Sequence, residues 1–263
     1  GKTTLLNALM KRTVDLGRAD VHGSVKLNGT PLPDWFPSII GYVPQFDQLM
    51  PGLTCRELIT FSANLRLPAG TSQATIESHV EETLAQLGIQ GVADSIAVPA
   101  PSMGSRGISG GEQRRVAVAL ELVVKPQLLF LDEATSGLDS FRAESLVRSL
   151  RAYAHGPGER LVVLTVHQPS PTIFAALDGV ICLLAGRLAF HGAPTDVLPF
   201  FSARGHSAPM DVSAPEHMLA VINAPEVAAL VAAGDWLPVP DKAVAEGAVV
   251  PDKETAGAES VMQ

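Results

Sequence analysis

Two acidic residues directly after an apolar run, Asp132 and Glu133, form the pair in this sequence best suited to catalysis. The preceding run, Leu128–Leu131, predicts a strand that is buried on both faces. A carboxylate at the C-terminal end of a parallel strand lies at the edge where open α/β sheets bind ligands. Asp132 can therefore hold a magnesium ion through water, and Glu133 can orient or deprotonate an attacking water. The alternative interpretation is a pair of surface acids after a strand.

The first residues of the chain supply the phosphate-binding half of the same chemistry. The segment Gly1-Lys2-Thr3-Thr4 matches the end of the P-loop pattern, in which backbone amides and a lysine hold nucleotide phosphates and a hydroxyl binds magnesium. Taken alone, the segment is more typical of an ordinary helix N-terminus. A P-loop enzyme also needs a carboxylate on a neighbouring strand for its metal, and Asp132 follows such a strand. Together the two segments predict hydrolysis of ATP with Mg²⁺.

A third segment, Ile108-Ser109-Gly110-Gly111-Glu112, joins a loop to a predicted helix. Its glycines and the start of the helix expose backbone amides that can bind an anion without obstruction by side chains. Such a triplet by itself is more typical of a flexible linker. Its place in the order of motifs favours a second phosphate-binding element.

The order of these motifs, completed by His167 after another apolar run, resembles the ATP-binding cassette family from Gly1 to about Gly205. The resemblance implies that Ser109, Gly110 and Gly111 close on an ATP held by the P-loop of a second cassette, so activity would require a dimer. The partner cassette would be a second copy, a different chain or another half of the same chain.

The resemblance also implies roles for three residues outside the first three segments. Gln45 matches the glutamine that touches the metal and links it to a helical subdomain, and His167 matches the switch histidine on the γ-phosphate. Asp139 matches the loop that contacts the second cassette. The implied metal ligands are Thr3, Gln45 and Asp132. Without the resemblance, Gln45 would be a solvated turn residue and His167 a structural histidine.

Several further motifs are similar to the G subfamily, whose members transport pigments, sterols and drugs. They are Ile108–Arg115 with Glu at position 112, His167-Gln168-Pro169-Ser170, Ile173-Phe174, Asp178, Leu53-Thr54 with Glu57, residues 61–68, and Phe200-Phe201 with Gly205. Two features depart from the family pattern: Ala134 replaces the usual proline, and residues 213–219 match only loosely. Because the chain begins inside the P-loop, we expect it to bind ATP weakly or not at all by itself, as calorimetry would measure.

The apolar pattern and the resemblance together predict an α/β fold of the P-loop NTPase (RecA-like) class, with a mainly parallel sheet flanked by helices. A small antiparallel edge is expected at the Asn28-Gly29 turn, which follows the alternating residues 21–27. Other strands are expected at residues 39–43, 128–131, 161–166, 177–184 and 188–190, and helices within residues 53–87 and at 116–123. Leu58, Ile59, Phe61 and Leu65 are expected on one helix, and residues 98–106 are expected to form a loop.

The predicted cassette domain covers residues 1–205, with a core of 1–47 and 108–205 and an inserted helical subdomain of 48–107. Residues 206–263 are expected to form a linker or tail toward a transmembrane domain. From Pro225 onward we expect irregular chain, because large apolar side chains are too few to offset the entropy of ordering.

Composition excludes some classes of function. The net charge of −8 argues against a nucleic-acid partner, since no general basic field is present. Cys55 and Cys182 are expected to be reduced thiols. No apolar run reaches the roughly 20 residues that a bilayer-spanning helix needs, and no leader segment is apparent. The expected location is the cytoplasmic face of a membrane, reached through a transmembrane domain.

The function that fits these motifs best is an ATPase that powers export of a lipid, a sterol or a foreign compound. Two alternatives stay open. A soluble cassette ATPase acting on ribosomes or DNA would carry basic patches or a second cassette. A degenerate regulatory cassette without turnover is disfavoured because Lys2, Asp132, Glu133 and His167 are all present.

Overall fold

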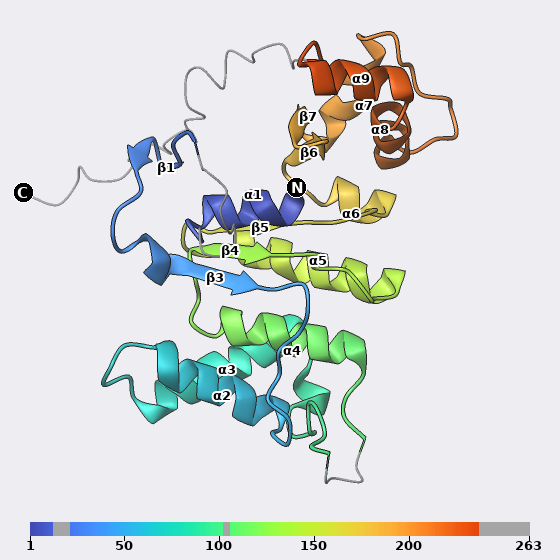
Figure 1. The fold of residues 1–263 in the computed structure, drawn as a ribbon. Helices are drawn as coiled ribbons and strands as arrows, with labels where there is room; N and C mark the ends of the chain where they lie inside the picture. The colour runs from blue at the N-terminus through green and yellow to red at the C-terminus, as the bar shows by residue number, and fades with distance from the viewer. Residues whose placement is uncertain (13–21, 102–105, 237–263) are drawn as a thin grey trace, which may run out of the picture.

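The computed structural model describes residues 1–12, 22–101 and 106–236 (Figure 1). Its centre is a three-stranded parallel sheet of order β3-β4-β5, with β3 at Ile40–Val43, β4 at Leu128–Leu131 and β5 at Leu161–Leu164. In this register Val43 pairs with Leu131, which pairs with Leu164. The C-terminal ends of all three strands therefore meet at one edge, and the prediction of a parallel sheet is confirmed. Residue 21, residues 102–105 of the expected loop and the tail beyond 236 lie outside the described residues.

Alternate residues of β4 pack on opposite faces of the sheet, as the pleat of a strand requires. Leu128 and Phe130 join a cluster with Leu6 and Met10, so helix α1 (Lys2–Leu9) covers one face. Leu129 and Leu131 join the largest cluster, which also contains helix α4 (Gly110–Leu122). The continuous apolar run of β4 thus reflects burial on both sides.

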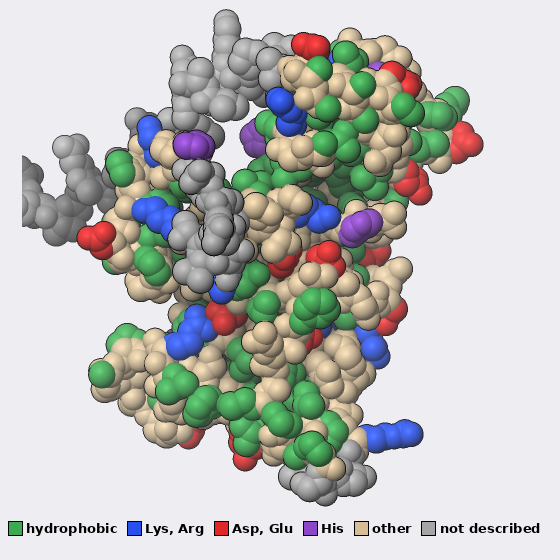
Figure 2. All heavy atoms as spheres, in the orientation of Figure 1, with side chains coloured by type: hydrophobic (Ala, Val, Ile, Leu, Met, Phe, Trp, Pro, Cys, Tyr) green, Lys and Arg blue, Asp and Glu red, His purple; other side chains and the backbone are tan. Residues whose placement is uncertain are grey.

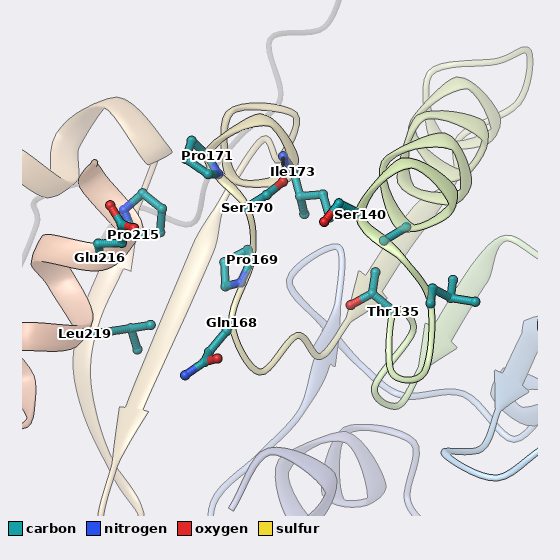
Figure 3. A pocket seen from close by; sticks show the side chains of 12 residues that line it. Thr135, Ser140, Gln168, Pro169, Ser170, Pro171, Ile173, Pro215, Glu216 and Leu219 are labelled. Atoms are coloured by element: carbon teal, nitrogen blue, oxygen red, sulfur yellow. Dashed lines mark hydrogen bonds between the residues drawn. The ribbon is translucent and has the colours of Figure 1, made fainter. Parts of the chain in front are cut away.

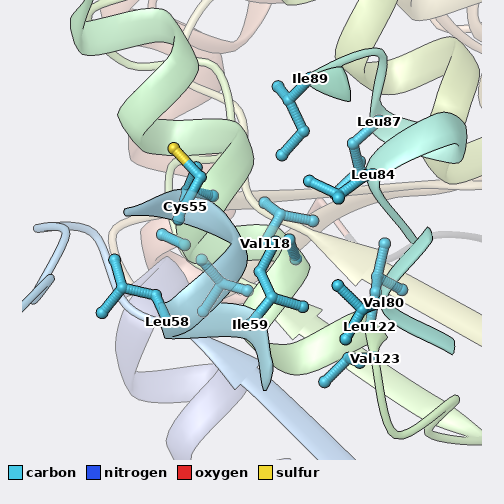
Figure 4. Close-up of a cluster of buried hydrophobic side chains, with 14 of the residues drawn as sticks. Cys55, Leu58, Ile59, Val80, Leu84, Leu87, Ile89, Val118, Leu122 and Val123 are labelled. Atoms are coloured by element: carbon cyan, nitrogen blue, oxygen red, sulfur yellow. The ribbon is translucent and has the colours of Figure 1, made fainter. Parts of the chain in front are cut away.

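Helices α2 (Cys55–Arg66) and α3 (Gln73–Leu87) come after β3 in the sequence and before α4. Both begin at side-chain caps, Thr54 for α2 and Ser72 for α3, and α3 ends at Gly88 in the left-handed conformation. Short 3-10 turns complete this part of the fold, η2 (Phe36–Ile39) before β3 and η3 (Gln90–Val92) after α3. Figure 4 shows the apolar side chains of α2, α3 and α4 meeting in one core.

The prediction that Leu58, Ile59, Phe61 and Leu65 share one helix is confirmed, since all four lie in α2. Leu58 and Ile59 are buried, whereas Phe61 is 49% exposed and Leu65 is 69% exposed. Each residue advances about 100° around a helix, so Phe61 and Leu65 lie about one turn apart on a single outer face. The inner face instead uses the small side chain of Ala63.

Helix α4 contacts both the two inserted helices and the sheet. At its C-terminal end, Glu121 accepts the backbone N–H of Tyr42 at 3.2 Å and forms an ion pair with Arg66 of α2 at 2.8 Å. The insert and the parallel sheet therefore share one hydrophobic core through α4.

Two antiparallel hairpins complete the strands. The first pairs β1 (Lys26–Leu27) with β2 (Thr30–Pro31), and Asn28 and Gly29 both have positive φ, of 49° and 78°. The second pairs β6 (Val180–Leu184) with β7 (Arg187–Gly192), and Ala185 and Gly186 have φ of 49° and 79°. Positive φ at both central residues is the signature of a tight type I′ turn, as the Asn28-Gly29 pair predicted.

The expectation of irregular chain from Pro225 is wrong as far as residue 236. Helix α9 (Pro225–Ala233) follows α8 (Ala214–Ile222), and both pack on the β6–β7 hairpin and α7 (Val197–Ser202). Val227 and Val231 are buried, and Trp236 donates its indole N–H to the carbonyl of Ala189 at 3.0 Å. Burial of a few large apolar side chains therefore offsets the entropy that this segment loses on ordering. The average composition of the segment had not indicated this. The remaining short elements are α6 (Pro171–Ala175) and η4 (Pro194–Asp196).

No single helix among the described residues is long and apolar enough to cross a membrane. Helices α8 and α9 are long and apolar enough for a span only when taken together, and the chain bends by 71° between them.

Candidate functional site

The loops that follow the three parallel strands gather the predicted catalytic residues at one edge of the sheet. Gln45 follows β3, Asp132 and Glu133 follow β4, and His167 follows β5. The Nε2 group of Gln45 donates a hydrogen bond to Oε2 of Glu133 at 3.0 Å. Residues far apart in sequence therefore come into direct contact at this edge.

Asp132 is almost completely buried, with 1% of its surface exposed. Its Oδ1 accepts a hydrogen bond from the hydroxyl of Thr165 at 2.6 Å, and that hydroxyl oxygen accepts the backbone N–H of Glu133 at 2.7 Å. Within the described part of the chain, Oδ2 of Asp132 has no hydrogen-bond donor. One oxygen is thus fixed by the protein while the other remains available to a cation.

The backbone of Glu133 adopts a conformation that side-chain-bearing residues rarely use, with φ of 47°. Left-handed geometry costs roughly 1–2 kcal/mol for a residue that is not glycine. Three hydrogen bonds hold it: Glu133 N–H to Thr165, Ala134 N–H to the carbonyl of Thr165 at 3.3 Å, and Ser136 N–H to the carbonyl of Glu133 at 3.1 Å. Strain maintained in this way is typical of functional positions. The Ala134 N–H bond is one that the family's usual proline could not make.

Arg114 connects the two loops that carry Gln45 and Glu133. It lies on α4 and is 2% exposed. Its guanidinium donates to the carbonyls of Pro44 and Asp132 at 2.6 and 2.8 Å and pairs with Asp47 at 2.7 Å. Weaker bonds reach the carbonyls of Glu133 and Ala134 at 3.3 and 3.4 Å.

Arg114 and Thr165 have structural roles that the motifs did not predict. Arg114 lies within the motif Ile108–Arg115, and Thr165 is the polar residue in an otherwise apolar run before His167. A polar side chain inside an apolar strand signals a buried hydrogen bond, and this clue was present in the sequence.

The N-terminus of α4 is closed by a capping box. The hydroxyl and the backbone N–H of Ser109 both donate to Glu112, at 2.6 and 2.8 Å. The Ser109 hydroxyl bond and, next, its backbone N–H bond lower the pKa of the Glu112 carboxyl below its usual value. The Ser109 hydroxyl therefore points to Glu112 of its own chain in this structure.

The two glycines after Ser109 have different surroundings. A Cβ on Gly111 would lie 3.0 Å from Cδ of Arg142 and 3.4 Å from Cδ2 of Leu138, so the space there is filled. A Cβ on Gly110 would meet nothing within 4 Å. Gly110 therefore faces open space, as a backbone that receives a ligand must.

The other predicted residues lie around this edge without direct contacts to it. Gly1 precedes α1 as its N-cap without a side-chain cap, Lys2 is half-buried, and Thr3 and Thr4 are exposed. His167 is exposed and has no hydrogen bond within residues that the structure describes. Asp139 caps α5 (Ser140–Ala154) by accepting the N–H of Arg142 at 2.9 Å. Figure 1 shows that α1 begins on the side where the parallel strands end.

A pocket of ≈ 540 Å³ lies beside this edge (Figure 3). It is lined by Thr135, Leu138, Ser140 and Ala143, by Gln168–Pro171 and Ile173, and by Pro215, Glu216 and Leu219 of α8. None of the predicted site residues lines it.

Charged side chains of both signs are scattered over the face shown in Figure 2. In the described residues, no group of three or more His, Cys, Asp or Glu side chains could hold a metal ion by itself. Any metal at this edge would need oxygen ligands from other residue types or from a substrate.

Comparison with known proteins identifies the class to which this fold and site belong. A model of the ABC transporter family matches residues 1–136, so the chain belongs to that family and has its P-loop NTPase fold. It is an ATP-binding cassette, the ATPase domain of such proteins, and is of the G type.

Relatives of the G type align over most of the chain. The "ABC transporter G family member STR" of Petunia hybrida is 39% identical over 85% of this chain and 26% of its own length. The "Broad substrate specificity ATP-binding cassette transporter ABCG2" of Sus scrofa is 34% identical over 97% of this chain and 37% of its own length. The "ATP-binding cassette sub-family G member 8" of Rattus norvegicus is 38% identical over 80% and 29%, respectively. The chain therefore spans little more than a third of these relatives at most.

Proposed function

We propose that the intact protein hydrolyses ATP with Mg²⁺ at a site formed by two cassettes and uses this cycle to export a lipid, a sterol or a foreign compound across a membrane. The observation that carries the proposal is the contact of Gln45 with Glu133 beside Asp132, whose Oδ1 is held by Thr165. This arrangement brings together Asp132 as the proposed metal ligand, Glu133 as the candidate base, and Gln45, which contacts Glu133 directly.

The P-loop end of the site would hold the phosphates of ATP. The first turn of α1 leaves backbone N–H groups unused, since Gly1 provides no side-chain cap. Those amides and the ammonium group of Lys2 suit the β- and γ-phosphates, and Thr4 extends the same turn. Thr3 presents an exposed hydroxyl for the metal.

Thr3, Gln45 and Asp132 fit a magnesium ion by their chemistry. Gln45 uses its amide nitrogen for Glu133, so its carbonyl oxygen remains for a cation, and Asp132 has Oδ2 available. Magnesium typically takes few protein ligands and completes its shell with water and substrate phosphates, which suits a site where the described residues contain no denser carboxylate cluster. When bound, the ion would stabilise the charge that develops during phosphoryl transfer.

Glu133 and His167 would act on the reacting groups. The Gln45 bond holds one oxygen of Glu133 in place, and the other is left to orient or deprotonate the attacking water. His167 is exposed at the same edge and could bond the γ-phosphate. Both side chains extend from loops that Thr165 ties together.

A second cassette would complete the site with Ser109, Gly110 and Gly111, while Asp139 lies at the contact between cassettes. Gly110 faces open space, which suits backbone approach to a phosphate. The hydroxyl of Ser109 would have to turn from Glu112 to reach the γ-phosphate. The helical subdomain of residues 48–107 would pass the motion to membrane helices, and residues 206–263 would lead toward them from the cytoplasmic face.

The transport part of the proposal is tested with inside-out vesicles that contain the intact protein. We expect ATP, but not a non-hydrolysable analogue, to drive accumulation of a fluorescent phospholipid, a fluorescent sterol or rhodamine 123. ATP hydrolysis without uptake of any of these three probes would contradict the proposed substrate classes.

Thr165→Val keeps the shape of the side chain but removes the hydroxyl that holds Asp132 and Glu133. Loss of a group that orients a metal ligand typically lowers metal affinity or activity by about 10–100-fold, and we expect the apparent Mg²⁺ constant for hydrolysis to rise within that range. The measurement is ATPase rate against free Mg²⁺. Thr165→Ser, which retains the hydroxyl, should behave as the wild type. An unchanged Mg²⁺ dependence in Thr165→Val would show that this bond does not position Asp132.

A further inference from the structure

Arg114 holds together two loops of the site and lies on the helix that begins with the third motif. Its strongest contacts reach Pro44 and Asp47 on the Gln45 side and Asp132 on the Glu133 side. Two other polar contacts join the same strand ends: the Gln45–Glu133 bond and the bond from the backbone N–H of Asp132 to the carbonyl of Val43 at 2.9 Å. The guanidinium of Arg114 adds a buried side-chain link between the two loops.

Arg114 also lies near the start of α4, close to the glycines of the third motif. Gly110 and Gly111 lie four and three residues earlier, respectively, so they are about one helical turn away on the same side of α4. The capping box at Ser109 satisfies backbone N–H groups at the start of α4 and fixes where the helix begins. Arg114 therefore connects the first turns of α4 to the loops of Gln45 and Glu133.

We propose that Arg114 is a positioning residue that orients Glu133 and Gln45 for hydrolysis and links them to the start of α4, which caps the ATP of the partner cassette. This inference rests on the proposed function.

The chemistry of these contacts calls for arginine. The guanidinium is planar and carries five N–H donors in a fixed fork, and here it serves four carbonyls and one carboxylate. A lysine ammonium is a single point with three donors, so it could not bond both loops at once. Arg114→Lys should therefore preserve the charge and lose the positioning.

The test compares Arg114→Met and Arg114→Lys with a matched control, Arg115→Met, in the intact protein. Arg115 is the neighbouring residue on α4, but its guanidinium donates to the carbonyls of Leu87 and Arg142, away from both loops. The readouts are kcat per ATP-binding site, the KM for MgATP and the number of sites that bind a fluorescent ATP analogue.

We expect kcat per site to fall by about 10–100-fold in both Arg114 variants, the cost of a small misplacement of catalytic groups, with KM nearly unchanged. The control should keep the kcat of the wild type. If Arg114→Met fails to fold, Arg114→Lys decides the outcome alone. Unchanged kcat per site in Arg114→Lys, or a loss explained entirely by fewer binding sites, would overturn this inference. Absence of hydrolysis by the wild type would instead overturn the proposed function and this inference with it.

Discussion

Glu133→Gln is expected to abolish nearly all ATP hydrolysis while ATP still binds. A positioned general base contributes roughly 10²–10⁴-fold to a rate, so kcat should fall within that range. Glutamine has almost the same shape and keeps a carbonyl oxygen that can accept the bond from Gln45. The loop therefore keeps its geometry, and ATP-bound closed pairs of cassettes should accumulate because the step that opens them is blocked.

The measurement is kcat together with the ATP retained after gel filtration of the intact protein. Glu82→Gln is the matched control, since it makes the same chemical change at a surface carboxylate that pairs with Lys125 at 2.7 Å. The control should hydrolyse ATP as the wild type does. Undiminished hydrolysis in Glu133→Gln would mean that Glu133 is not the base.

Gly110→Asp is the second change with a large expected effect. A Cβ at this position meets no atom within 4 Å, so the variant should fold normally. An added carboxylate would face the γ-phosphate in the closed dimer, and two like charges 4 Å apart repel by about 4 kcal/mol at an effective dielectric constant of 20. That energy corresponds to roughly a 10³-fold loss of rate through the closed state.

The check on Gly110→Asp measures ATPase rate and binding of a fluorescent ATP analogue side by side. Binding should persist, because the analogue is held by the P-loop of its own chain. Gly91→Asp, at another glycine with open space around it, serves as the control and should retain full activity. If the Gly110→Asp protein hydrolysed ATP at the wild-type rate, Gly110 would not be part of the ATP site.

The local signals in the sequence predicted the strands and turns that position the site. The apolar run of β4 and the Asn28-Gly29 pair specify structure through burial and backbone conformation alone, and both predictions are confirmed. The shared helix of Leu58 and Phe61 is confirmed as well, but apolar character alone did not reveal which face of that helix is covered. The ordered segment around Trp236 was missed because its stability comes from one specific docking site on β7.

The order of the motifs along the chain indicated that Gln45 and Glu133 belong to one site, and the structure places them in contact. The contacts of Arg114 and Thr165 could not be predicted from the sequence and are seen only in the structure. Their partners are mostly backbone groups, which every sequence possesses. A guanidinium that bonds four carbonyls leaves no pattern of partner residues to recognise. The catalytic, phosphate-binding and metal-binding roles assigned to all of the site residues, Lys2, Asp139 and His167 among them, stay predictions.

The most direct test of the shared ATP site uses mixed pairs of the intact protein. In one pair, one copy carries Lys2→Met and the other carries Gly110→Asp. In the second pair, one copy carries both changes and the other carries none. If each ATP is held by Lys2 of one cassette and capped by Gly110 of the other, the first pair keeps one complete site and hydrolyses ATP, while the second pair is inactive. Activity in the second pair and none in the first would contradict the account, because both residues would then serve the same nucleotide within a single chain.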